Sequence, residues 1–210
     1  TKNSQDGISM IQTAEGALNE THSIIQRMRE LAVQSSNDTN TQEDREKLQL
    51  EVNQLVEEIN RIGNTTEFNT RVLMDGTYDA GGVLFHIGAN KDQNVNLKFN
   101  DMRSGALNLQ GISIISQDDA NNAIETINTS LETVSTERAK FGAMQNRLEH
   151  TINNLRVSGE NLQAAESRIR DTDMANEMVK LNKDRIISQS GTAMLAQANT
   201  SPQSVLQLLR

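Results

Sequence analysis

The sequence predicts a mostly α-helical protein: a long antiparallel, coiled-coil-like helical bundle with a small β-hairpin region and a C-terminal amphipathic helix. Helix is favoured because the 210 residues include a single Pro and carry apolar residues at heptad spacing over long stretches. Only 35% of the residues are hydrophobic and 2% aromatic, which leaves little bulk for the compact core of a typical globular enzyme. Seven of the twelve Gly lie between positions 63 and 111, and this concentration marks the non-helical part.

The first two helices follow from heptad patterns separated by a polar stop. Apolar residues recur every seven positions from about 4 to 36, and the polar run 37–40 predicts the end of this helix. Thr41, with Asp44 three residues later, predicts the start of a second helix that reaches Ile62. The expected core positions of the two helices are Ile11, Leu18, Ile25, Ala32, Leu48, Val52, Leu55, Ile59 and Ile62.

The glycine-rich region contains two stretches of strand-like alternation. Apolar residues alternate with others over 83–87 and again over 95–99, so we expect two short strands joined by a turn at 90–94. Residues 68–74 are a plausible third strand or hairpin arm. Residues 100–117 lack a clear period and are expected to form a polar connection.

A third helix is predicted from about 117 to 165, and a fourth amphipathic stretch follows residues 171–173. The expected core positions of the third helix are Ile124, Ile127, Leu131, Val134, Phe141, Leu148, Ile152, Leu155, Leu162 and Ile169. Three such helices can bury one another by packing antiparallel. The fourth stretch has no partner among them, so its apolar residues need another subunit, a chaperone or a further segment.

Composition excludes several classes of function. Lys and Arg total 20 and Asp and Glu total 28, so the net charge of −8 disfavours nucleic-acid and membrane-surface partners. The chain contains no Cys, and its three His lie on different predicted elements without a second ligand at metal-binding spacing. We therefore expect no catalytic residues, no metal and no cofactor.

Several motifs resemble the two conserved regions of bacterial flagellin, most closely those of the Bacillus type. Residues 16–21 (GALNET), 26–34 (QRMRELAVQ), 66–69 (TEFN) and 73–76 (LMDG) are similar to the N-terminal region. Residues 145–155 (QNRLEHTINNL), 165–171 (AESRIRD), 194–199 (MLAQAN) and 205–210 (VLQLLR) are similar to the C-terminal region. Only about 77–117 lacks a match, where the family places its variable outer region.

The resemblance implies a structural subunit of the flagellar filament, exported by a type III route and assembled outside the cell for swimming. Residues 1–170, with a β insertion at about 65–100, correspond to the helical rod of the outer tube, and residues 171–210 to the C-terminal inner-core helix. The N-terminal inner-core segment is expected to be absent before Thr1, and such a fragment would not polymerise unaided. The alternative considered is a coiled-coil signalling rod of the chemoreceptor type, which would not contain a β insertion.

The resemblance also implies partners and their sites. They are other flagellin subunits, an export chaperone that holds the C-terminal segment in the cytoplasm, a second flagellin-binding assembly regulator, and a Toll-like receptor in a host. The expected chaperone and inner-core residues are Met178, Leu181, Ile186, Ile187, Met194, Leu195, Val205, Leu206 and Leu209. The expected receptor and subunit contacts are Arg27, Glu30, Leu31, Gln34 and Glu51.

Overall fold

A computed structural model describes the backbone of residues 1–208 and the side chains of residues 1–200. The chain divides into two compact units, residues 1–157 and residues 158–210. The helices are α1 (Lys2–Ser35), α2 (Gln42–Thr65), α3 (Gln117–Arg170) and α4 (Met174–Leu208), and the strands are β1 (Glu67–Phe68), β2 (Arg71–Val72), β3 (Val83–His86) and β4 (Asn94–Leu97). The predicted fold class, mostly helical with a small β region, is confirmed.

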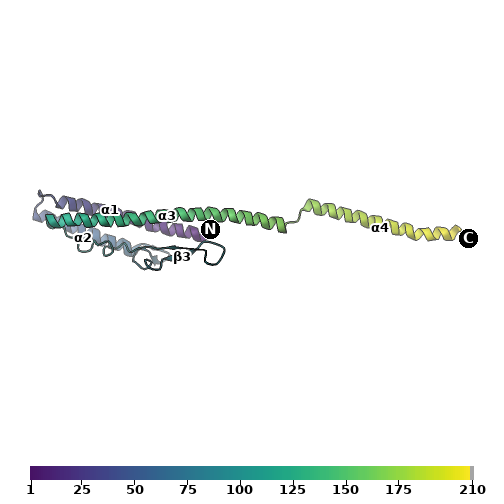
Figure 1. Ribbon diagram of the computed structural model, residues 1–210, viewed down its shortest axis with the longest axis horizontal. Helices are drawn as coiled ribbons and strands as arrows, with labels where there is room; N and C mark the ends of the chain where they lie inside the picture. Colours follow the sequence, from purple (N-terminus) through teal and green to yellow (C-terminus); the bar gives the residue numbers. More distant parts are fainter. Residues whose placement is uncertain (209–210) are drawn as a thin grey trace. The chain divides into compact units, whose positions relative to one another are not determined.

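Three helices form the first unit, which contains α1, α2 and the first part of α3 (Figure 1). The α1 residues Ile11, Leu18 and Ile25 are fully buried, as their heptad spacing predicts. A Cβ atom on Gly7 of α1 would lie 3.3 Å from Leu148 Cδ1 of α3 and 3.7 Å from the Phe85 ring. Gly7 therefore allows α1, α3 and β3 to approach one another closely.

Helix α2 begins directly after its predicted cap, Thr41, and ends three residues beyond its predicted end. The Thr41 side chain accepts a hydrogen bond from the Asp44 backbone N–H, and the Asp44 carboxylate accepts one from the Thr41 N–H. The helix continues past the predicted end at Ile62 to Thr65. The buried face of α2 also differs from the predicted one by one position: Gln49 is buried, whereas the predicted core residue Leu48 is only partly buried.

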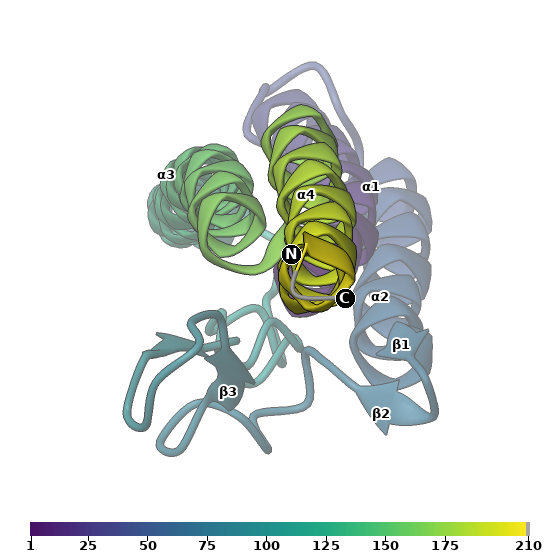
Figure 2. The ribbon, with the colours of Figure 1, turned by 90° about the vertical axis from the view of Figure 1, so that its right-hand side faces the viewer.

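The β region consists of two antiparallel hairpins on one side of the bundle (Figure 2). In the predicted hairpin β3–β4, Val83 pairs with Leu97 and Phe85 pairs with Val95. The predicted arm at 68–74 is instead the short hairpin β1–β2, which turns through Asn69 and Thr70 at positive φ.

The connection between β4 and α3 corrects one prediction, because it is part of the core and not a polar loop. The Phe99 ring is fully buried and packs at 5.3 Å, centroid to centroid, from Phe141 of α3. Other buried apolar residues of this connection are Met102, Leu107, Leu109 and Ile114. Polar side chains of the helices hold its backbone: Gln49 binds the backbone of residues 112 and 114, and Ser130 donates to the Leu107 carbonyl at 2.7 Å.

The long helix α3 runs through Gly142 and Gly159 without a break and belongs to both units. Its predicted core positions Val134, Phe141 and Leu148 are buried in the first unit. The predicted core positions Leu162 and Ile169 are wrong, because these side chains are 71% and 88% exposed. Among the helices of the described residues, none is both long and apolar enough to cross a membrane.

Candidate assembly and partner surfaces

The apolar surface of α4 is the largest group of exposed hydrophobic side chains on a single element. Asp173 caps the helix, since its carboxylate accepts hydrogen bonds from the backbone N–H groups of Ala175 and Asn176 at 3.0 and 3.2 Å. The exposed side chains, which we call the α4 apolar surface, are Met174, Met178, Val179, Leu181, Ile186, Ile187, Met194 and Leu195. Their exposed fractions range from 43% at Leu181 to 69% at Met194.

Six of the nine residues predicted for this segment are therefore exposed on α4. They are Met178, Leu181, Ile186, Ile187, Met194 and Leu195. The side chains of Val205 and Leu206, and Leu209 as a whole, lie outside the described residues. Sequence reasoning missed Met174 and Val179, although Met174 lies four residues before Met178 on the same helix face.

The α4 apolar surface covers more than one side of its helix. Met174, Met178 and Leu181 recur at the i, i+4, i+7 spacing of a single face. Ile187 and Met194 are seven residues apart and share a second face, which at about 100° per residue is about 220° around the helix from Met174. A single flat partner cannot cover both faces, so α4 is suited to being enclosed.

A second surface is centred on Arg27 of α1. The Arg27 Nε donates to Glu51 Oε1 of α2 at 2.9 Å, and its Nη1 donates to Glu30 Oε2 at 3.1 Å. These hydrogen bonds, first the one donated to Glu51 and then the one donated to Glu30, raise the pKa of Arg27 above its ordinary value. The Arg27 side chain remains 50% exposed, so the pairs contribute little to stability but present a defined charge pattern.

The structure brings together three of the five predicted contact residues of this surface. Arg27, Glu30 and Glu51 form the ion-pair cluster, and Gln34 is exposed one turn beyond Glu30. Leu31 differs, because its side chain is only 1% exposed and belongs to the core. Leu31 is therefore not accessible to a partner, and it supports the surface from beneath.

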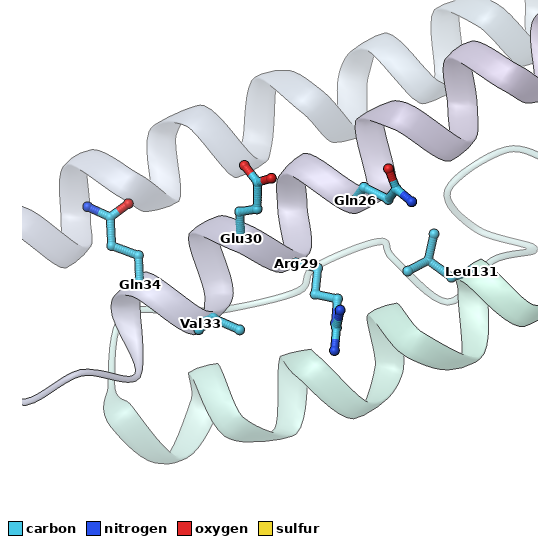
Figure 3. Close-up of a pocket in the computed structure, with 6 residues that line it drawn as sticks. All are labelled: Gln26, Arg29, Glu30, Val33, Gln34 and Leu131. Atoms are coloured by element: carbon cyan, nitrogen blue, oxygen red, sulfur yellow. The ribbon is translucent and has the colours of Figure 1, made fainter.

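Beside this cluster, a groove of about 490 Å³ lies between α1 and α3 (Figure 3). Arg29 and Val33 of α1 lie on the side of α1 that faces Leu131 of α3. The Val33 side chain is 50% exposed, and the remaining lining residues are Gln26, Glu30 and Gln34. The 26–34 motif therefore supplies Arg27 and Glu30 of the ion-pair cluster and one wall of an adjacent groove.

The described residues offer no constellation typical of catalysis or metal binding. No group of three or more His, Asp or Glu among them could hold a metal ion. His22 contacts Gln26 through its Nε2 at 3.0 Å, within one helix.

Comparison with protein families gives two matches that together cover most of the chain. Residues 1–79 match the bacterial flagellin N-terminal helical region, and residues 124–209 match the bacterial flagellin C-terminal helical region. The unmatched stretch between them contains β3, β4 and the buried connection. The helices that form the bundle therefore match family regions, and the β3–β4 hairpin does not.

Individual proteins agree with these matches. The flagellin of Halalkalibacterium halodurans is 55% identical over all of this chain and 77% of the relative's length. The flagellin of Bacillus subtilis is 49% identical over all of this chain and 80% of its own length. The crystal structure of Bacillus cereus flagellin has a TM-score of 0.66 and 31% identity, over 78% of this chain and 94% of that one. None of these similarities supports a chemoreceptor-type signalling rod.

Proposed function

This chain belongs to the bacterial flagellin family and is a structural subunit of the extracellular flagellar filament, not an enzyme; from this premise we propose how its surfaces are used. The α4 apolar surface is the segment that packs into the inner core of the filament. An export chaperone covers the same surface in the cytoplasm before type III export. Residues 1–170 supply the outer-tube rod, whose ion-pair cluster contacts neighbouring subunits.

The exposure of the α4 apolar surface is the observation that carries the proposal. Six side chains predicted for this role are about half exposed. Burying the apolar area that these side chains still expose would contribute roughly 1 kcal/mol of binding free energy for each side chain. The sum is on the order of 6 kcal/mol before the entropy cost of ordering is subtracted. This free energy is enough to drive the binding of a partner. The apolar area behind it is too large to remain in contact with water in an assembled filament.

The chaperone assignment can be tested with a charge placed on the α4 apolar surface. Leu181→Asp introduces a carboxylate at a position that a bound partner would bury, so its affinity for the purified export chaperone should fall on the order of 100-fold. Asn182→Asp is the matched control, because it adds the same charge to the exposed neighbouring position of the same helix. Calorimetric titration of both variants gives the comparison.

Two outcomes of this titration contradict the chaperone assignment. Unchanged affinity of Leu181→Asp would remove α4 from the chaperone site. Equal losses in both variants would attribute the effect to net charge and not to the apolar surface.

The Arg27 cluster is proposed to contact neighbouring subunits and, in a host, a Toll-like receptor. Arg27→Ala removes the shared partner of Glu30 and Glu51, whereas Arg61→Ala removes a similar exposed pair with Glu58 elsewhere on α2. A receptor reporter assay should therefore lose signal with Arg27→Ala and keep it with Arg61→Ala. Full signalling by Arg27→Ala would end the receptor assignment.

A further inference from the structure

The eight methionines fall into two groups with opposite environments. Met174, Met178 and Met194, on α4, are 66%, 48% and 69% exposed. In the first unit, Met10, Met28, Met74 and Met102 are at most 2% exposed, and Met144 is partly buried. Chemistry that depends on access to a thioether will therefore distinguish α4 from the bundle.

Methionine oxidation is such chemistry. A peroxide transfers one oxygen atom to the thioether: the O–O bond breaks, an S–O bond forms, the sulfur loses two electrons and the second peroxide oxygen leaves as water. The product, a sulfoxide, is polar and chiral where the thioether was apolar and flexible. Access of the oxidant to the sulfur limits the reaction, so the buried methionines of the first unit are protected by packing.

The three exposed methionines lie where this change has the largest effect on docking. Met174 and Met178 share one face of α4 with Leu181, and Met194 shares the second face with Ile187. Oxidation therefore places a strong hydrogen-bond acceptor on both apolar faces. A partner that covers these faces with apolar side chains offers the sulfoxide no donor, and burying it is unfavourable.

We propose that Met174, Met178 and Met194 form an oxidative modification site, and that sulfoxidation of the unassembled subunit weakens the docking of α4. The inference rests on the proposed docking function of the α4 apolar surface. A bound partner that covers α4 also covers the three sulfur atoms. The subunit is thus sensitive to peroxide before it is covered and protected afterwards.

The first test measures where oxidation occurs. The full 210-residue chain is treated with hydrogen peroxide, with and without denaturant, and the oxidised methionines are identified by peptide mass mapping. In the folded chain Met174, Met178 and Met194 should oxidise at least about tenfold faster than the buried group, and in denaturant all eight should oxidise at similar rates. Equal rates in the folded chain would overturn the site.

The second test measures the effect on docking. The oxidised chain and the untreated chain are titrated with the purified export chaperone, and oxidation should weaken binding by about tenfold or more. Treatment with both methionine sulfoxide reductases, one for each epimer, should restore the affinity. Equal affinities of the oxidised and untreated chains would refute the inference.

A matched variant separates this inference from the proposed function. Met174→Leu/Met178→Leu/Met194→Leu keeps apolar volume but cannot be oxidised, so it should bind the chaperone like the parent chain and remain unaffected by peroxide. A loss of binding by this variant after peroxide treatment would place the sensitive group elsewhere and overturn the site. If the untreated parent chain fails to bind, the docking function fails; if it binds and oxidation changes nothing, only the redox inference fails.

Discussion

The side chain of Gln49 links α2 by hydrogen bonds to the connection that precedes α3. Replacing Gln49 by Leu tests whether this buried amide stabilises the first unit. Its Nε2 donates to the Ile112 carbonyl at 3.0 Å, and its Oε1 accepts from the Ile114 N–H at 2.7 Å. The residue is only 9% exposed. Nε2 also donates to Asn53 Oδ1 at 2.9 Å. Leu has similar bulk, so Gln49→Leu removes all three hydrogen bonds with little change in volume.

The expected loss follows mainly from the two backbone groups left behind, because the third partner, Asn53, is an exposed residue whose amide can bind water. The Ile114 N–H is in a fully buried residue and would be left without this acceptor, at about 1–3 kcal/mol. The Ile112 carbonyl is in a partly buried residue, and the added apolar burial of Leu offsets part of its loss. We therefore expect Gln49→Leu to lower the free energy of unfolding of the first unit by about 2–3 kcal/mol.

Tyr78 provides an assay specific to the first unit. It is the single Tyr of a chain without Trp, and it packs against the core of that unit. Urea unfolding followed by Tyr78 fluorescence should show a midpoint lowered by roughly 1 M in Gln49→Leu, given typical slopes of about 1–3 kcal/mol per M. Gln54→Leu, at an exposed position of the same helix, is the control and should stay within about 0.5 kcal/mol.

A Gln49→Leu midpoint indistinguishable from that of the parent chain would refute this reasoning. It would mean that water or a shifted backbone satisfies Ile114 without the side chain. An equal loss in Gln54→Leu would instead indicate a general effect of added Leu on α2.

Three further predictions use the same Tyr78 assay. Thr41→Ala removes the capping hydrogen bond to Asp44 and should lower the free energy of unfolding by about 1 kcal/mol; no change would mean that the cap is redundant. Phe99→Ala should lower it by about 3–5 kcal/mol, because Phe99 is fully buried against Phe141, and a loss below about 1 kcal/mol would show that the site collapses without penalty. The hydrogen bond from Arg103, opposed by partial burial, lowers the pKa of Asp101, so its contribution is present above the ordinary carboxyl pKa and is lost as the pH falls through the lowered one. Asp101→Asn should therefore be less stable than the parent chain at pH 7, and this difference should shrink as the pH falls below the ordinary carboxyl pKa; a difference independent of pH would exclude this pair as its source.

The helices could be predicted from the sequence because their burial is periodic. Ile11, Leu18 and Ile25 recur every seven residues and all three are fully buried. The Thr41 cap was likewise visible, because a capping box depends on two residues three apart. The same local logic gave the β3–β4 hairpin, in which apolar residues alternate.

The connection between β4 and α3 could not be predicted in this way. The buried residues of its 100–117 segment, such as Leu107 and Leu109, follow turns and not a fixed period, so their spacing carries no signal. Gln49 was missed for a related reason, since a polar residue is buried only when a distant backbone offers it partners, here at positions 112 and 114.

The candidate surfaces could also be predicted from the sequence only in part. The residues of α4 followed from an amphipathic stretch without a partner, and the resemblance to a family supplied the reason for it. The burial of Leu31 was not foreseen, because similarity to a motif does not show which side of α1 faces α2 and α3. The ion pair of Arg27 with Glu51 depends on the packing of α1 against α2, which brings together two residues 24 positions apart in the sequence.

The second unit contains two helical segments, the end of α3 (residues 158–170) and α4, and they differ in how helix formation starts. The first continues α3 from the packed bundle without a loop, whereas α4 does not. Residues 158–170 extend a helix whose preceding turns are already held in the bundle by Phe141 and Leu148, so they need only propagation, which adds one hydrogen bond for each residue fixed. α4 is separated from them by residues 171–173 and must form its own first turn, an unfavourable nucleation step by a factor of about 10⁻³. Asp173 lowers that barrier by capping the new helix. A partner that binds α4 therefore shifts the helix–coil equilibrium of α4 alone, because the bundle supports helix formation only as far as residue 170.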